Sequence, residues 1–174
     1  MLPSKKGTFM FSFKSVCISI ACFLPFVATG CVETSMMFQG NTPSPAMDVV
    51  SLQKGESQSG TWETFDITIN YKYIQSGETL EISGQAVLNE HYQMNYRGIA
   101  NLDIFLFFLD EKLLVLKTAK ITRSMTGDVG EIMTFSQQYK VPDRAKSLSF
   151  GYDGTTSQER GFTPSFYELP LKKN

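Results

Sequence analysis

The chain has 174 residues, with 16 basic and 17 acidic side chains and a net charge of −1. This length is enough for one domain with a substantial core. The charge balance disfavours nucleic-acid binding and electrostatic docking on anionic lipid, because both need a surplus of Lys and Arg.

Residues 1–30 have the layout of a secretory signal peptide. Three lysines, the last of them Lys14, precede an uncharged run from Ser15 to Gly30. A basic start, a short apolar core and small residues at its end are typical of such signals. Met10 to Cys31 alone would also form a complete signal. A permanent transmembrane anchor is the weaker alternative, because a spanning helix needs roughly 20 apolar residues and this run is shorter and contains Pro25.

The tetrapeptide Ala28-Thr29-Gly30-Cys31 closes the uncharged run. It resembles the bacterial lipoprotein box, although Leu is commonest in that family where this chain has Ala28. The resemblance implies cleavage between Gly30 and Cys31 and attachment of lipid to Cys31. Ordinary signal cleavage at the same bond is the alternative, because Ala28 and Gly30 also satisfy the small-residue rule.

The use of cysteine favours the lipid. The chain has three cysteines, Cys17, Cys22 and Cys31, and the first two lie in the segment that would be removed. An exported domain normally holds cysteines in pairs or not at all, so one cysteine at the new N-terminus is well explained by acylation. Val32 follows Cys31, where inner-membrane lipoproteins of Gram-negative bacteria commonly have Asp. We therefore expect the outer membrane of the cell envelope, facing the periplasm or the cell surface.

The remaining residues 31–174 carry 13 basic and 17 acidic side chains, a net charge of −4. Residues 31–60 are rich in Ser, Thr, Gln, Gly and Pro and show little hydrophobic periodicity. This composition predicts a lipidated N-terminus and a flexible linker. The folded domain is expected to comprise residues 61–174.

From Trp62 onward the hydrophobic pattern has a period of two. Alternation across residues 65–73 predicts a strand with one buried face. The turn sequence 75–78 and the apolar positions of residues 80–88 complete a predicted hairpin, with Gly84 as a possible bulge.

Residues 89–98 are polar and aromatic and predict a loop. The run from Leu102 to Leu109 is apolar on both faces, which fits a central strand of the core. Further strands are predicted over residues 113–121, 132–141 and 148–152. Six or seven short strands with frequent turns predict an all-β fold, an antiparallel immunoglobulin-like β-sandwich, with a small barrel as the alternative.

Residues 84–89, together with Phe107-Phe108-Leu109-Asp110, resemble the small bacterial β-sandwich domains named for a Phe-x-Leu-Tyr-Asp (FxLYD) motif. Phe107 and Leu109 match, but Asp110 follows directly where that pattern has a Tyr first. The resemblance implies a noncatalytic β-sandwich.

Few residues have a pattern that points to chemistry. His91 is the only histidine, no nucleophile-elbow motif occurs, and no cysteine is left for a metal. We therefore expect no catalytic residue, metal or cofactor. Tyr92 and Tyr96 are the predicted binding residues, because aromatic side chains in loops at one end of a sandwich commonly grip a partner. The alternative is that they cover an edge of the sandwich.

The sequence thus predicts a lipoprotein of the cell envelope, held to the membrane through Cys31, with a noncatalytic binding or structural role. Its partner would be an envelope protein or a carbohydrate. One alternative is a carbohydrate- or ligand-binding module that uses Tyr92 and Tyr96. The other is an envelope hydrolase built on loop carboxylates, which would need two carboxyl groups roughly 5–10 Å apart in a cleft.

Overall fold

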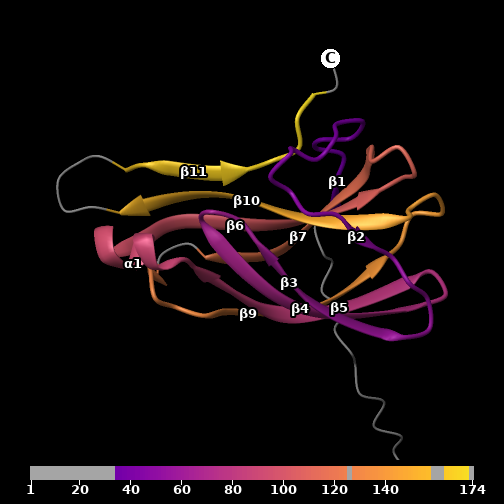
Figure 1. Ribbon diagram of the computed structural model, residues 1–174, viewed down its shortest axis with the longest axis horizontal. Helices are drawn as coiled ribbons and strands as arrows, with labels where there is room; N and C mark the ends of the chain where they lie inside the picture. The colour runs from indigo at the N-terminus through magenta and orange to yellow at the C-terminus, as the bar shows by residue number, and fades with distance from the viewer. Residues whose placement is uncertain (1–33, 125–126, 158–162, 173–174) are drawn as a thin grey trace, which may run out of the picture. The chain divides into compact units, whose positions relative to one another are not determined.

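The computed structural model describes residues 34–124, 127–157 and 163–172, which form two packed β-sheets and one short helix (Figure 1). The elements are β1 Thr34–Ser35, β2 Val50–Ser51, β3 Ser57–Glu63, β4 Ile67–Ser76, β5 Thr79–Leu88, α1 Glu90–Asn95, β6 Gly98–Leu109, β7 Val115–Ser124, β8 Gly127–Asp128, β9 Met133–Lys140, β10 Ser147–Ser157 and β11 Ser165–Glu168. The expected signal peptide, its cleavage site at Gly30 and the lipidation site Cys31 lie outside the described residues.

The strand order is that of an immunoglobulin-like sandwich. One sheet has the order β3-β4-β5-β9 and the other β1-β7-β6-β10-β11, with β2 beside β10 and β8 beside β6. Apart from the two-residue β8, seven strands run from β4 to β11. Of these, β4, β5 and β9 lie in one sheet and β7, β6, β10 and β11 lie in the other, which is a division found in immunoglobulin-like sandwiches. The predicted antiparallel immunoglobulin-like sandwich is therefore confirmed. Strand β3 and the two-residue strands β1, β2 and β8 add to the six or seven strands predicted.

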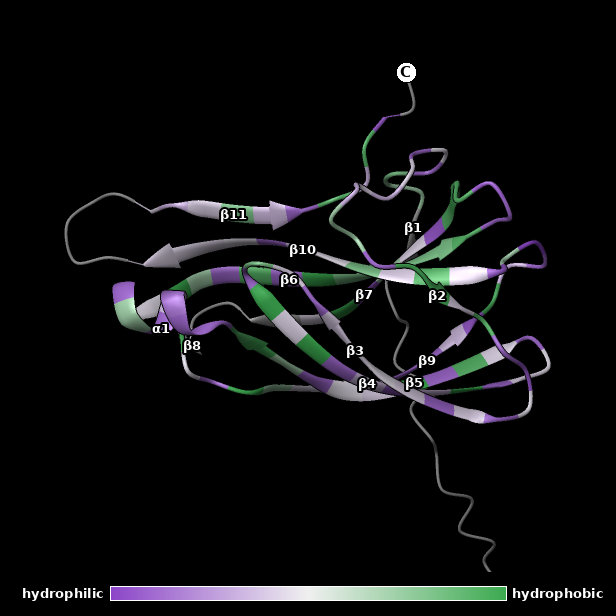
Figure 2. Cartoon of the chain, in the orientation of Figure 1, coloured by the Kyte–Doolittle hydropathy of each residue, from purple (hydrophilic) through white to green (hydrophobic). Residues whose placement is uncertain are grey.

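Strands β4 and β5 form the predicted hairpin. Ser76 lies opposite Thr79, which leaves a two-residue turn that begins with Gly77 at a φ of 59°. Glycine adopts this left-handed conformation without the clash that a Cβ would cause. Alternate residues of β4, such as Ile67 and Ile69, are buried between the sheets, and Figure 2 shows the resulting bands of high and low hydropathy along the strand.

Two details of this region differ from the prediction. Phe65 is not on the buried face of a strand but is exposed in the turn between β3 and β4. Gly84 does not form a bulge, because β5 keeps a regular register with both of its neighbours. A Cβ at Gly84 would overlap the carbonyl oxygen of Asn70 and the ring of Phe135, so the close approach of these neighbours requires glycine.

Strand β6 is the central strand that its sequence predicts, with apolar side chains buried on both faces. Leu106 and Phe108 belong to the set that packs between the two sheets, and the ring of Phe108 lies 6.3 Å from that of Tyr139 in the opposite sheet. Phe105 and Phe107 face the other side, yet they too are buried. The outer face of this sheet must therefore be covered.

Residues 36–52 provide that cover, and we call them the strap. They lie within the segment predicted to be a flexible linker, so over these residues that prediction is wrong. The ring of Phe38 packs edge-on against Phe107, with the ring centroids 5.8 Å apart, and Met47 is 5% exposed. Between Phe107 and Met47 there is no space for a side chain at Gly151. Burial of apolar surface on both sides fixes the strap to the sheet.

Hydrogen bonds hold the strap at both ends. The Gly40 N–H donates to the carbonyl oxygen of Val115 at 2.9 Å, which extends the contact of β1 with β7. At the other end the carbonyl oxygen of Asp48 accepts from Trp62 Nε1 at 3.1 Å and from Ser149 Oγ at 2.7 Å. One strap carbonyl thus bridges β3 of one sheet and β10 of the other.

We predict that Met47→Ala lowers the free energy of unfolding by about 2–4 kcal/mol, because it removes a buried side chain and leaves a cavity beneath the strap. Urea unfolding measures the loss. Met36→Ala is the matched control, since Met36 is exposed in the same segment and its truncation is expected to cost less than about 0.5 kcal/mol. Equal effects of the two substitutions would contradict a docked strap.

Candidate functional site

The predicted loop at residues 89–98 contains the helix α1, at one end of the sandwich (Figure 1). Glu90 lies in its first turn, where a negative charge stabilises the helix through its attraction to the positive end of the helix dipole. Tyr92 and Tyr96 are four residues apart, a helix-turn spacing that brings their rings to 5.5 Å, although Tyr96 is itself the C-cap residue.

Asp66, in the turn between β3 and β4, joins three parts of the fold. The Tyr92 hydroxyl donates to its Oδ1 at 2.9 Å and the Tyr152 hydroxyl donates to its Oδ2 at 2.6 Å. His91 Nε2 lies 3.7 Å from the same Oδ1. The carboxylate therefore ties the β3–β4 turn to α1 and to β10 of the opposite sheet, with hydrogen bonds of the strong, charge-assisted kind.

This arrangement perturbs both tyrosines. Burial raises the pKa of Tyr92 far above its ordinary value, and the hydrogen bond to Asp66 and the negative charge of Asp66 raise it further. Burial and the same carboxylate also raise the pKa of Tyr152, while its contact with Thr64 acts in the opposite direction. Both hydroxyls are therefore held as neutral donors, which fits a structural link rather than a catalytic base.

Phe65 is the most exposed aromatic residue of this end of the molecule, with 80% of its surface accessible. Its ring lies against the imidazole of His91, with the ring centroids 4.3 Å apart. The Asn89 side-chain amide donates to the carbonyl oxygens of Thr64 at 2.9 Å and Phe65 at 3.1 Å, which holds the turn. An exposed aromatic ring on a rigid turn loses little conformational entropy when it binds a partner.

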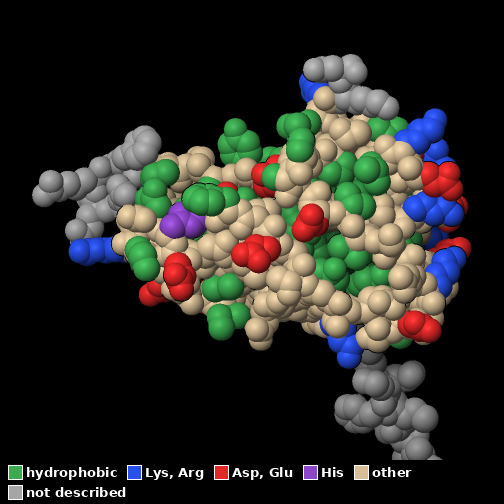
Figure 3. Space-filling view, in the orientation of Figure 1, with side chains coloured by type: hydrophobic (Ala, Val, Ile, Leu, Met, Phe, Trp, Pro, Cys, Tyr) green, Lys and Arg blue, Asp and Glu red, His purple; other side chains and the backbone are tan. Residues whose placement is uncertain are grey.

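Two other exposed apolar residues lie at the same end. Met94, 78% exposed, is in α1, directly after β5, and Ile132, 57% exposed, immediately precedes β9. Since β4 and β9 both run antiparallel to β5, the residues before each of them share one end of the sheet with α1. We call Phe65, His91, Met94 and Ile132 the α1 end. Figure 3 shows apolar side chains around the histidine there, with several carboxylates nearby.

The two predicted binding residues are thus only partly where the sequence placed them. The structure brings Tyr92 and Tyr96 together at one end of the sandwich, but Tyr92 is buried against Phe166 and Tyr96 is half-buried. They support the site from below and do not form an exposed platform. Sequence reasoning missed Phe65, because its place in the alternating pattern made it look like a core residue.

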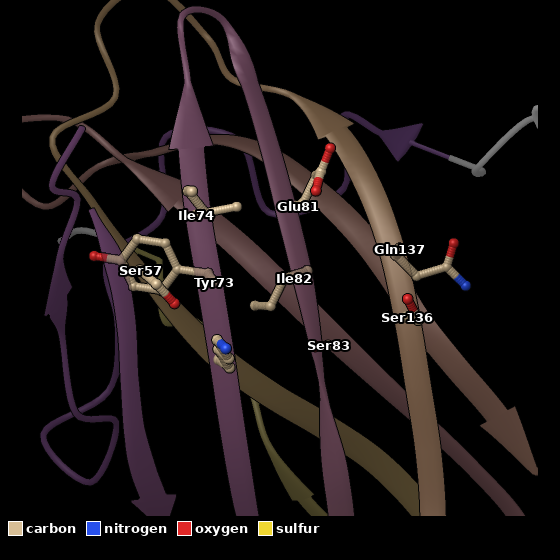
Figure 4. A pocket seen from close by; sticks show the side chains of 9 residues that line it. Ser57, Tyr73, Ile74, Glu81, Ile82, Ser83, Ser136 and Gln137 are labelled. Carbon is tan, nitrogen blue, oxygen red and sulfur yellow. The ribbon is translucent and has the colours of Figure 1, made fainter. Parts of the chain in front are cut away.

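A second, polar surface lies on the outer face of the β3-β4-β5-β9 sheet. Lys72 stands between Ser59 and Ser83, and Ser83 in turn lies opposite Ser136, so one row across four strands carries a single long side chain. A shallow hollow of about 310 Å³ lies along this row, bordered also by Glu81 (Figure 4). Its short hydroxyl side chains suit a hydroxyl-rich ligand.

The loop carboxylates have roles in their own loops. Asp110 Oδ1 accepts from the N–H groups of Lys112 and Leu114, at 2.8 and 2.9 Å, and Asp128 Oδ1 accepts from the N–H of Gly130 at 2.9 Å. These bonds are typical of Asx turns. Within residues 34–124, 127–157 and 163–172, no group of three or more His, Cys, Asp or Glu side chains is placed to hold a metal ion, and no helix is long and apolar enough to cross a membrane.

Comparisons with protein-family models, curated proteins and solved structures find no match to this chain. The resemblance to the FxLYD domains therefore stays a prediction. The candidate site is argued from its geometry alone.

We predict that the fold loses stability at alkaline pH through Tyr92 and Tyr152. A pKa that is higher in the folded than in the unfolded chain means that the folded state holds the proton more tightly. The contribution of the two protonated hydroxyls to the free energy of unfolding is therefore complete below the ordinary tyrosine pKa of about 10 and is lost as the pH rises above it. Urea unfolding at about pH 8 and at about pH 11 measures this loss, which Tyr152→Phe should reduce. Tyr167→Phe, at an exposed tyrosine, is the control. An equal loss of stability in the unaltered protein and in the Tyr152→Phe and Tyr167→Phe variants would contradict the prediction.

Proposed function

We propose that this protein is a lipid-anchored, noncatalytic binding protein of the cell envelope, and that the α1 end contacts a partner protein. The observation that carries the binding role is the exposed ring of Phe65, which packs on His91 in a hydrogen-bonded turn. The anchor is supported by the lipoprotein-type tetrapeptide that ends at Cys31 and by the absence of any later cysteine in the sequence. A lipid at that position would be the membrane attachment.

The composition of the α1 end favours a protein partner. Phe65, Met94 and Ile132 are apolar and exposed, and aromatic and Met side chains are enriched at protein interfaces. Among these three, Phe65 is the candidate hot spot, because binding energy concentrates in a few well-supported aromatic anchors. Carboxylates near this end would form the polar rim of such an interface (Figure 3).

The position of the α1 end along the sandwich also supports this role. Strand β1 pairs with β7 at Thr34 and Ser35, and the β7 residues there pair with Leu106 and Phe107 of β6. Helix α1 precedes β6, which begins at Gly98. At about 3.3 Å per residue, β1 is therefore displaced by about 26 Å along β6 from the α1 end. A lipid on Cys31 would leave the α1 end free to meet a partner.

For the anchor, we predict that Cys31→Ser abolishes acylation and moves the protein from the membrane fraction to the soluble fraction. Labelling with a fatty-acid analogue and fractionation of cells measure both effects. Cys22→Ser is the matched control, since Cys22 lies in the segment expected to be removed and its loss should leave the labelling intact. Unchanged labelling of the Cys31→Ser variant would contradict the anchor.

For the partner, we predict that a photocrosslinking amino acid at Phe65 or Met94 forms an adduct with one envelope protein in intact cells. The same amino acid at Leu171, another exposed apolar position but outside the α1 end, should not form it. With the partner identified, Phe65→Ala should weaken its binding at least about tenfold, as expected for a hot spot. The stability of the domain should change by less than about 0.5 kcal/mol, because Phe65 is exposed.

The same adducts from the photocrosslinking amino acid at Phe65, Met94 and Leu171 would contradict a role for the α1 end.

Carbohydrate binding is the second candidate function, and the polar row through Lys72 and Ser83 is the observation that favours it. Glycan binding that is lost in Lys72→Met and Ser83→Leu, and kept in Phe65→Ala, would support this second function in place of the first.

A further inference from the structure

We infer that the edge of the sandwich formed by β1, β7 and the end of β9 rests on the lipid bilayer, with Met36 among the lipid headgroups. This inference rests on the proposed acylation of Cys31, and it adds an orientation of the domain to that anchor. Met36, 80% exposed, follows β1 directly and lies where the strap begins.

The surface around Met36 is an apolar groove. Leu116 of β7 and Val141 and Pro142, which follow β9, are its apolar lining together with Met36, and it has a volume of about 470 Å³. Its charged lining is Lys117, Lys140 and one acidic residue, Asp143, so the two lysines outnumber the carboxylate. Val141 is buried at its base and Leu116 is half-buried, while Met36 stands at its rim. Exposed apolar residues grouped around a groove mark an interaction surface.

Two lysines flank the groove. Lys117 Nζ donates to the carbonyl oxygen of Lys140 at 2.9 Å, and burial, together with the positive charge of Lys140, lowers the pKa of Lys117. A lipid phosphate between the two ammonium groups would offset this repulsion. Lys140 also pairs with Glu78 at 3.2 Å, but both side chains are exposed, and exposed pairs are worth only about 0–1 kcal/mol. Exchange of Glu78 for a phosphate therefore costs little.

The short length of chain between Cys31 and the strap favours the bilayer as the surface that covers this groove. Five residue steps separate Cys31 from Met36, and an extended chain spans at most about 3.6 Å per step, so the two Cα atoms are within about 18 Å of each other. The strap begins at Met36 and is fixed to the sheet, so this edge cannot move far from a lipid on Cys31. The net charge of −4 opposes docking without an anchor, whereas an anchored chain presents the bilayer with an apolar groove flanked by lysines.

The test uses the acylated protein in vesicles of phosphatidylethanolamine and phosphatidylglycerol. Acylation blocks Cys31 and signal cleavage removes Cys17 and Cys22, so an introduced cysteine is the only free thiol. Met36→Cys and, as matched control, Met94→Cys each receive an environment-sensitive fluorophore, because the two methionines are almost equally exposed. Spin-labelled lipid is then added as a quencher that acts only at the bilayer.

We expect severalfold stronger quenching, and a blue-shifted emission, for the label at position 36 than for the label at position 94. Equal quenching at the two positions, in protein whose mass shows the acyl chains on Cys31, would overturn the orientation and leave the anchor intact. A mass without acyl chains on Cys31 would overturn the anchor and the orientation together. The mass spectrum therefore distinguishes the two failures.

Discussion

The fold depends on the packing of the strap against the outer face of β6. A strand that is apolar on both faces needs cover on both, and the second sheet covers only one of them. Phe38 and Met47 supply the other cover, above Phe105 and Phe107. Because the carbonyl oxygen of Asp48 also receives hydrogen bonds from both sheets, the strap fixes the sandwich as well as the face beneath it.

Much of the sandwich was predictable, because burial on one face of a strand leaves a period of two in the sequence. Strands β4, β5 and β9 show that alternation, and the two-sided run of β6 marked the centre. The strap escaped prediction because its apolar residues, Phe38 and Met47 among them, follow no period of two and are interspersed with Ser, Pro and Gly. The helix α1 has six residues, too few to establish a helical period.

The candidate site, too, could be predicted from the sequence only in part. The sequence singled out Tyr92 and Tyr96 as aromatic residues between two strands, and they do lie together at one end of the sandwich. It did not indicate that Asp66 would bind the hydroxyls of Tyr92 and Tyr152, since that contact joins residues 86 positions apart. Nor did the sequence indicate that Phe65 lies outside the core, because the alternation of apolar and polar residues along β4 continues into the turn that contains Phe65.

Hydrogen exchange of backbone amides tests the role of the strap most directly. Gly40 and Leu52 donate to Val115 and Lys146, each at 2.9 Å, at the two ends of the strap. If the strap is part of the fold, these two amides exchange about as slowly as amides within β7 and β10, because they open only when the sandwich does. Exchange at the rate of an unstructured chain, in a protein whose β6 amides are fully protected, would show that residues 36–52 are a linker after all.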